Sequence, residues 1–295
     1  MKKLALLLAA LGVVSAATYA APELTVTHIG QEIEIENEDH NGTDLDDVWL
    51  FNNVGLAYGD WTFGLQAGKK WKVNFDDDHG KNKGITSDDS RLQIDVWKKV
   101  TDDLKLGFRY RGHKKYDRYY ARWDYSNGMF WSSGDVWYEA TNGSELKTPD
   151  DKTDWIKSEI FPIGLKYGAF KLGYFVNYNK AVGDMVDGQQ EDYFEHQIRA
   201  YATLYKGEKL TLTTEGRFTI SADKGYEGKE PKYRHYDDFG RNRIYLGADY
   251  QVNENLKTFV KYGYEFRDWK LENGETDDHK ANAYQDFIVG WTYRF

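Results

Sequence analysis

The sequence predicts an all-β fold: a twelve-stranded antiparallel transmembrane β-barrel with short periplasmic turns and long extracellular loops. Three observations carry this prediction. Apolar and polar residues alternate with period two along most of the chain, short turns alternate with long polar connections, and an alternating segment ends on the aromatic residue Phe295. The alternative is a secreted all-β sandwich, whose strands also alternate but which has no use for such an ending.

Composition narrows the class of protein. The 295 residues include 10 Trp, 23 Tyr and 15 Phe but no Cys, and 29% of them are charged. Tyr and Trp suit a surface that is apolar on one side and wet on the other, whereas scattered charges exclude a bundle of transmembrane helices. The lack of Cys excludes a disulfide scaffold and thiol-ligated zinc. With a net charge of −9, the chain offers no general attraction to nucleic acid, and we expect no such partner.

Residues 1–20 have the pattern of a secretory signal peptide. Lys2 and Lys3 precede an apolar run from Leu4 to Ala17, and Thr18-Tyr19-Ala20 forms a small-residue cleavage site. We therefore expect two segments, the signal peptide and an outer-membrane β-barrel over residues 21–295. Export without a helical anchor predicts the bacterial cell outer membrane, with lipid and lipopolysaccharide around the barrel.

The strands follow from the alternation and from the turns that bound it. Trp61, Phe63 and Leu65, for example, alternate with Thr62, Gly64 and Gln66, and similar patterns recur to the last strand. We expect strands at residues 24–37, 45–58, 61–75, 88–100, 104–118, 154–167, 169–180, 191–205, 209–222, 241–252, 256–270 and 281–295. Five short turns join them on one side, and both termini fall on that periplasmic side because the number of strands is even.

The connection at residues 112–153 is the longest of six long ones. It interleaves many aromatic residues with Lys114, Lys115, Arg118 and Arg122. Such a loop is more often functional than idle. It predicts either a segment that folds into the pore and stacks against sugar rings, or an extracellular hairpin whose aromatic side chains pack on one another.

The two faces of each strand have different surroundings. Lipid offers no hydrogen-bond partners, so the apolar face points outward and the other face lines a lumen. This rule predicts pore-lining and substrate-binding residues at Lys70, Lys72, Arg91, Arg109, Arg111, Arg199, Arg217, Arg241, Arg243, Lys261 and Arg267. Inward acids are fewer: Glu32, Glu34, Glu36, Asp95, Glu195, Glu215, Asp249, Glu265 and Asp286. A bulge at Gly30 would reverse the first three.

Two segments resemble known porins. Val100-Thr101-Asp102-Asp103-Leu104, followed by Arg109-Tyr110-Arg111, resembles the turn and ascending strand of the oligogalacturonate-specific monomeric porins, and the end of the chain from Val289 to Phe295 looks like their last strand. That resemblance implies a twelve-stranded barrel whose lumen faces anionic sugars with basic residues, and it carries over only Arg109 and Arg111 as candidate ligand contacts. The acidic loops and Asn253-Glu254-Asn255-Leu256 also look, more loosely, like the major outer-membrane porins of fusobacteria, which implies general diffusion. The length, the inward acids and the 112–153 loop depart from the sugar-specific pattern.

The predicted function is that of a porin. Rings of Lys and Arg in a narrow pore favour anions, so we expect passive ion and carbohydrate transport of small hydrophilic solutes, with anionic or sugar-like ones preferred. We expect no enzyme activity, no cofactor and no metal site, and the oligomeric state stays open. One alternative is a non-conducting barrel that acts as an adhesin or structural protein. The other is an outer-membrane hydrolase built on His235 beside Asp237 and Asp238, although the chain has no Gly-x-Ser-x-Gly elbow.

Overall fold

The computed structural model of this chain describes most of the segment after the predicted signal peptide. The described residues are 22–38, 45–74, 84–141, 153–183, 189–226, 234–235, 239–268, 270–271 and 283–295. The predicted signal peptide lies outside them. Among these residues, none forms a helix that is long and apolar enough to cross a bilayer.

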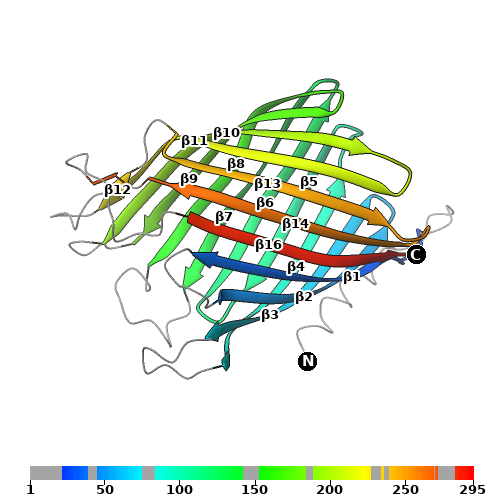
Figure 1. Cartoon of the computed structure of the whole chain (residues 1–295), viewed down its shortest axis with the longest axis horizontal. Coiled ribbons are helices and arrows are strands. Elements are labelled where there is room, and N and C mark those ends of the chain that lie inside the picture. Colours follow the sequence, from blue (N-terminus) through cyan, green and yellow to red (C-terminus); the bar gives the residue numbers. More distant parts are fainter. Residues whose placement is uncertain are drawn as a thin grey trace.

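Fourteen strands form one closed antiparallel barrel (Figure 1), in which each strand pairs with the wall strands before and after it in the chain and β1 closes against β16. The wall strands are β1 (Thr25–Glu38), β2 (Leu45–Tyr58), β3 (Trp61–Asn74), β4 (Gly84–Lys99), β5 (Leu104–Gly112), β6 (Tyr116–Asn127), β7 (Phe130–Thr141), β8 (Asp154–Tyr167), β9 (Phe170–Val182), β10 (Gln190–Lys206), β11 (Leu210–Tyr226), β13 (Arg241–Gln251), β14 (Leu256–Arg267) and β16 (Ala283–Arg294). Two short strands, β12 (Arg234–His235) and β15 (Lys270–Leu271), pair with each other in a separate small sheet. The side chain of His235, on which the hydrolase alternative depends, lies outside the described residues.

The prediction of twelve strands is wrong, because the 112–153 connection contains two further wall strands. β6 pairs with β5, and β7 pairs with β8, so this hairpin completes the wall and is neither a loop outside the barrel nor a plug within it. About eight strands leave an interior filled by side chains, whereas about sixteen leave an aqueous channel. With fourteen strands, this barrel is closer in size to barrels with an aqueous channel than to barrels filled by side chains.

The two ends of the barrel differ in their connections. Tight turns at Gly59, Gly128 and Gly168 join successive strands at one end, and each of these glycines has a φ of +55° to +57°. Such a left-handed backbone conformation favours glycine and gives two-residue hairpins the twist of their strands. The carboxyl terminus lies at the same end as these turns (Figure 1), as the alternation of short and long connections requires.

The outward face is apolar. Large apolar side chains such as Leu172, Leu246 and Val260 are exposed there, while the residues beside them in the strand point inward. A closed barrel leaves no strand edge unpaired, which is what hydrocarbon surroundings require. The predicted outer-membrane location is confirmed, because a closed barrel with an apolar outer belt is the architecture of outer-membrane proteins.

The register of β1 is fixed by its two neighbours. Glu32 lies opposite Phe51 and Glu34 lies opposite Trp49, and both aromatic side chains are buried on the lumen side. The irregularity in this strand falls between Val26 and His28, before Gly30. The three glutamates of β1 therefore face the lumen.

Candidate pore lining

Three arginines lie side by side on the lumen face of adjacent strands. Arg199 of β10 is the direct cross-strand partner of Arg217 on β11, which in turn is the partner of Arg243 on β13. Like charges directly opposite each other in a sheet repel. We call these three residues the arginine row, and the groups that hold them decide how much of their charge reaches the lumen.

Carboxylates hold two members of the arginine row. The Nε of Arg217 lies 2.6 Å from Glu215, whose other oxygen is 3.0 Å from the Nζ of Lys261. Arg243 donates to Glu265 at 2.5 Å and to the Tyr245 hydroxyl at 2.8 Å. Charge-assisted hydrogen bonds of this kind are strong, and they offset part of the charge of both arginines, since each carboxylate is shared with other cations.

Glu265 is the centre of a larger ion cluster. It is 2% exposed and also contacts Arg241 at 3.1 Å and Arg267 at 2.6 Å. Arg241 reaches Glu195 at 3.2 Å as well, and Arg267 reaches Glu38 at 2.6 Å. This cluster locks four strands together, because its members lie on β1, β10, β13 and β14.

Arg199, in contrast, is held by an amide. Its Nε donates to Gln197 Oε1 at 2.7 Å, and its guanidinium carbon lies 3.4 Å from the ring centre of Phe175. No carboxylate of the described residues lies within 4.0 Å of it. Gln197 donates in turn to Glu195 and Thr219, so it is fixed on both sides. Arg199 therefore keeps its full charge beside two partly neutralised arginines.

The same arrangement occurs on the other side of the barrel. Arg91 of β4 donates to Gln66 at 2.9 Å, and Arg111 of β5 donates to Gln93 at 2.8 Å. Neither has a carboxylate within 4.0 Å among the described residues. In the closed strand order of fourteen, β4 lies six steps from β10, the strand of Arg199, and thus nearly halfway around the wall. Guanidinium groups without a carboxylate partner therefore face the lumen from both sides.

The remaining predicted residues are partnered or peripheral. Arg109 donates to Asp95 at 2.6 Å, and Lys70 lies 2.9 Å from Asp47 and 2.7 Å from Asp88. Lys72 is exposed near the end of β3 and opposite Thr86. The eleven predicted residues thus fall into carboxylate-paired cations, three glutamine-held arginines and one exposed lysine.

Other functional residues escaped the sequence reasoning. Arg122 of β6 bonds both Asp95 and Asp135 at 2.6 Å, but the sequence placed it in a loop. The glutamine partners were not predicted either. The sequence did contain one indication of a glutamine partner. Gln197 and Arg199 are two residues apart on one strand, so their side chains lie on the same face of the wall.

Acidic side chains on β1 oppose the positive charge. Glu32 and Glu34 form no ion pair or hydrogen bond with any other described residue, whereas Glu36 accepts a hydrogen bond from the Tyr284 hydroxyl. Two carboxyl groups without a bonded partner among the described residues therefore face the same lumen as the three glutamine-held arginines.

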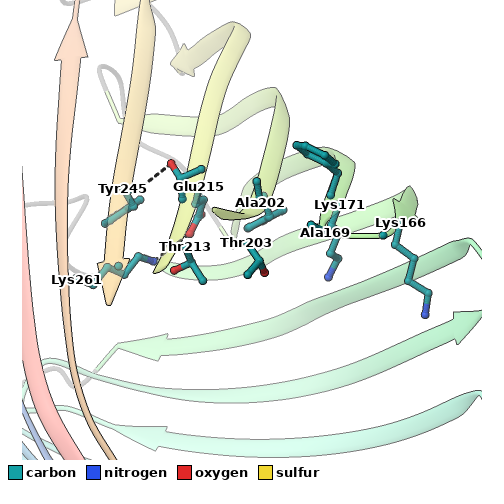
Figure 2. A pocket seen from close by; sticks show the side chains of 14 residues that line it. Lys166, Ala169, Lys171, Ala202, Thr203, Thr213, Glu215, Tyr245 and Lys261 are labelled. Carbon is teal, nitrogen blue, oxygen red and sulfur yellow. Dashed lines mark hydrogen bonds and ion pairs between the residues drawn. The ribbon is translucent and has the colours of Figure 1, made fainter. Parts of the chain in front are cut away.

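Cavities lie along this lining. One of about 380 Å³ is lined by Arg122, Lys171 and Arg199 together with the rings of Trp97 and Phe161. A second, of about 340 Å³, is lined mainly by amides and acids, including Gln31, Glu32 and Gln66. A third, of about 490 Å³, lies toward the end with the tight turns and contains Lys166, Lys171 and Lys261 (Figure 2). The wall thus offers solute-sized spaces beside charged groups.

Comparisons with known proteins show the fold and no family. No protein-family model matches the chain, and no curated protein sequence matches it. Among solved structures it is similar to a bacterial polysaccharide outer membrane secretin, with a TM-score of 0.52 at 9% identity over 90% of this chain and 98% of that one. OmpT of Vibrio cholerae has a TM-score of 0.47 at 12% identity, covering 95% and 100% of the two chains. An anion-selective porin from Comamonas acidovorans has 0.46 at 12%, covering 92% and 100%.

Proposed function

We propose that this protein is a passive diffusion channel of the outer membrane for small hydrophilic solutes, with a preference for anions. The observation that carries the proposal is the set of three lumen-facing arginines held by glutamine: Arg91, Arg111 and Arg199. A paired cation has little net charge to offer a passing ion. An arginine held by an amide is positioned equally well and keeps its charge.

The electrostatic reasoning is direct. A guanidinium presents five N–H donors in a fixed plane, and these match the oxygens of carboxylate and phosphate groups. In each of the three arginines the hydrogen bond to glutamine engages one nitrogen, and other N–H donors remain for a solute. An anion can exchange its hydration for these donors and then leave, because several weak sites in series conduct better than one strong site.

Sugar-like solutes are the finer part of this proposal. Rings of Trp97 and Phe161 line the cavity that contains Arg199, so an apolar sugar face and a charged group could be contacted together. We expect no covalent chemistry, no cofactor and no enzyme activity. The oligogalacturonate family stays a resemblance, because its two short segments have no support from a family match.

Single-channel recording tests the proposal. The mature chain is refolded into a planar bilayer, and both the current steps and the reversal potential are measured under a KCl gradient. We expect discrete current steps, with a reversal potential that lies closer to the equilibrium potential of chloride than to that of potassium. A folded barrel without steps would contradict a channel and direct attention to the adhesin alternative. Steps with cation preference would contradict the assigned role of the three arginines.

A further inference from the structure

Near the end of the barrel with the tight turns, two lysines lie opposite each other, and Asp124, the acid that attracts Lys171, forms no ion pair with it. Lys166 of β8 and Lys171 of β9 are direct cross-strand partners. Lys166 contacts the Ser126 hydroxyl, and neither Nζ has a carboxylate within 4.0 Å among the described residues. Side chains of directly opposed residues start only about 5 Å apart, so like charges there repel. The pair therefore has no anion in direct contact with it among the described residues.

Lys171 is held in this position by the wall behind it. Its Nζ lies 3.6 Å from the ring centre of Trp131, which is 5% exposed and donates from its indole nitrogen to the carbonyl of Leu172 at 3.1 Å. Gly164 and Gly173 leave the space for this ring, because a Cβ at either position would lie less than 3 Å from it. A cation on the face of an indole is attracted to the ring yet keeps its charge.

Both lysines line the cavity of about 490 Å³, and Figure 2 shows their side chains beside each other at one end of it. Thr203 and Thr213 line the same cavity, and neither hydroxyl has a hydrogen-bond partner among the described residues. A Cβ at Gly247, also in the lining, would lie 2.7 Å from Thr213 Oγ1, so glycine leaves that hydroxyl accessible. The cavity therefore combines two unneutralised ammonium groups with free hydroxyl groups.

The third lysine of the cavity differs from this pair. Lys261 lies 3.0 Å from Glu215 and 3.9 Å from the ring centre of Tyr245. That carboxylate also bonds Arg217, so it offsets the charge of Lys261 only in part. Lys166 and Lys171 are the two cations of the cavity that no described carboxylate contacts.

We propose that this cavity is a binding site for a multiply charged tetrahedral oxyanion, of the class of inorganic phosphate and phosphate monoesters. Two ammonium groups match two negative charges, and the hydroxyl groups can donate to further oxygens. A monovalent carboxylate would relieve the repulsion between the two lysines only in part. The site lies between the arginine row and the end of the barrel with the tight turns, so a solute that has passed the arginines meets it next.

This inference rests on the proposed function for its role in transport, but the binding can be measured without transport. Inorganic phosphate is titrated calorimetrically into the refolded mature protein in a zwitterionic detergent at low ionic strength, because salt screens such contacts. The variants are the double substitution Lys166→Gln/Lys171→Gln and the control Lys206→Gln, a lysine outside the cavity lining. We expect phosphate affinity to fall at least tenfold in the double variant and to stay unchanged in the control.

Acetate supplies the test of ligand class, and we expect it to bind more weakly than phosphate. Equal phosphate affinity in the double variant and in the unaltered protein would overturn the site. Equal affinity for acetate and phosphate would overturn its ligand class. In a bilayer, phosphate added on the side of the tight turns should reduce the chloride current of the unaltered channel and spare that of the double variant. A barrel that binds phosphate but carries no current would contradict the proposed channel function and still support this binding site.

Discussion

Arg199 and Arg217 are direct cross-strand partners on the lumen face, yet they are held by different chemical groups. The Nε of Arg217 bonds the carboxylate of Glu215, and the Nε of Arg199 bonds the amide of Gln197, in both cases two residues earlier in the same strand. The two pairs have the same geometry and differ in net charge. In this wall, the residue two positions earlier in the strand holds the arginine in place in both pairs. Whether that residue is glutamine or glutamate decides how much of the arginine's charge remains.

Replacing Arg199 by glutamine should lower the preference for anions more than replacing Arg217. Unit charges 4 Å apart in water interact by about 1 kcal/mol, so loss of one unneutralised charge should change the anion-to-cation permeability ratio by up to about fivefold. Reversal potentials of both variants in the same KCl gradient check this. An Arg217→Gln variant with the larger effect would contradict the distinction between amide-held and carboxylate-held arginines.

Replacing Glu34 by glutamine should act in the opposite direction. Glu34 faces the lumen without a hydrogen bond or ion pair to any other described residue, so its replacement breaks no contact. In recordings at pH 9, where this carboxyl is ionised, the substitution removes negative charge, so the reversal potential should indicate a stronger anion preference, with the unfolding midpoint in urea unchanged. Glu36→Gln is the matched comparison, since Glu36 already accepts a hydrogen bond from Tyr284. An unaltered reversal potential in Glu34→Gln would contradict the inward register of β1.

Replacing Glu265 by glutamine should destabilise the barrel. Glu265 is 2% exposed and contacts Arg241, Arg243 and Arg267, so the substitution leaves buried guanidinium groups without their shared carboxylate. Removal of one partner from a buried ion pair costs about 3–5 kcal/mol. Urea unfolding in detergent, followed by circular dichroism, measures this loss. An equally stable variant would show that the cluster contributes little to the fold.

Cysteine labelling can test the two strands that the sequence did not predict. The chain contains no Cys, so a single substitution gives a unique label. In the fourteen-strand barrel, Met129 lies in the tight turn between β6 and β7, whereas Lys115 lies in the connection between β5 and β6 at the other end. With the tight turns in the periplasm, Lys115→Cys should react with an impermeant maleimide on whole cells, and Met129→Cys only after permeabilisation. Labelling of both on whole cells would favour an extracellular loop.

The connection between β5 and β6 should respond to acid. Burial lowers the pKa of His113 to about 4, even though its Nδ1 lies 3.0 Å from Asp89. A depressed pKa means that the neutral imidazole contributes stability above the unfolded pKa of about 6.5, and that this contribution is lost as the pH falls to about 4. NMR titration of the imidazole should show a midpoint near pH 4. A midpoint near 6.5 would contradict the burial of this side chain.

The alternation of the sequence was sufficient to predict an all-β barrel, its faces and most of its strands. It failed in β6 and β7, because aromatic residues occupy both faces there. Tyr119 and Tyr125 face outward, and Tyr120 and Trp137 are buried on the lumen side. Aromatic side chains occur at lipid interfaces, and they also stack on one another in protein interiors. Tyr120 and Trp137 form such a stacked pair, with their ring centres 5.0 Å apart. The apolar-polar contrast that marks a strand is therefore weak in this hairpin.

The lining residues show a similar limit. The alternation of inward and outward residues along each strand indicated which basic residues point into the lumen. It could not indicate which of them bond a carboxylate that offsets their charge. Arg243 lies opposite Glu265 across the β13–β14 pair, and Arg91 shares a hydrogen bond with Gln66 on β3. Both partners depend on the register between strands, which the sequence of a single strand does not contain.

The amide partners also bear on how such a wall can change over generations. Glutamine and glutamate have nearly the same shape, and their codons differ by a single nucleotide. Gln66, Gln93 and Gln197 each accept from an arginine through Oε1. The amides of Gln93 and Gln197 also donate to Asp95 and Glu195, so glutamate at either position would oppose a second carboxylate. Gln66 donates instead to the side-chain amide of Asn53, which can turn to donate to a carboxylate. Exchange of Gln66 for glutamate therefore keeps the acceptor and cancels the charge of Arg91, so ion preference can shift there in a single genetic step that leaves the barrel intact.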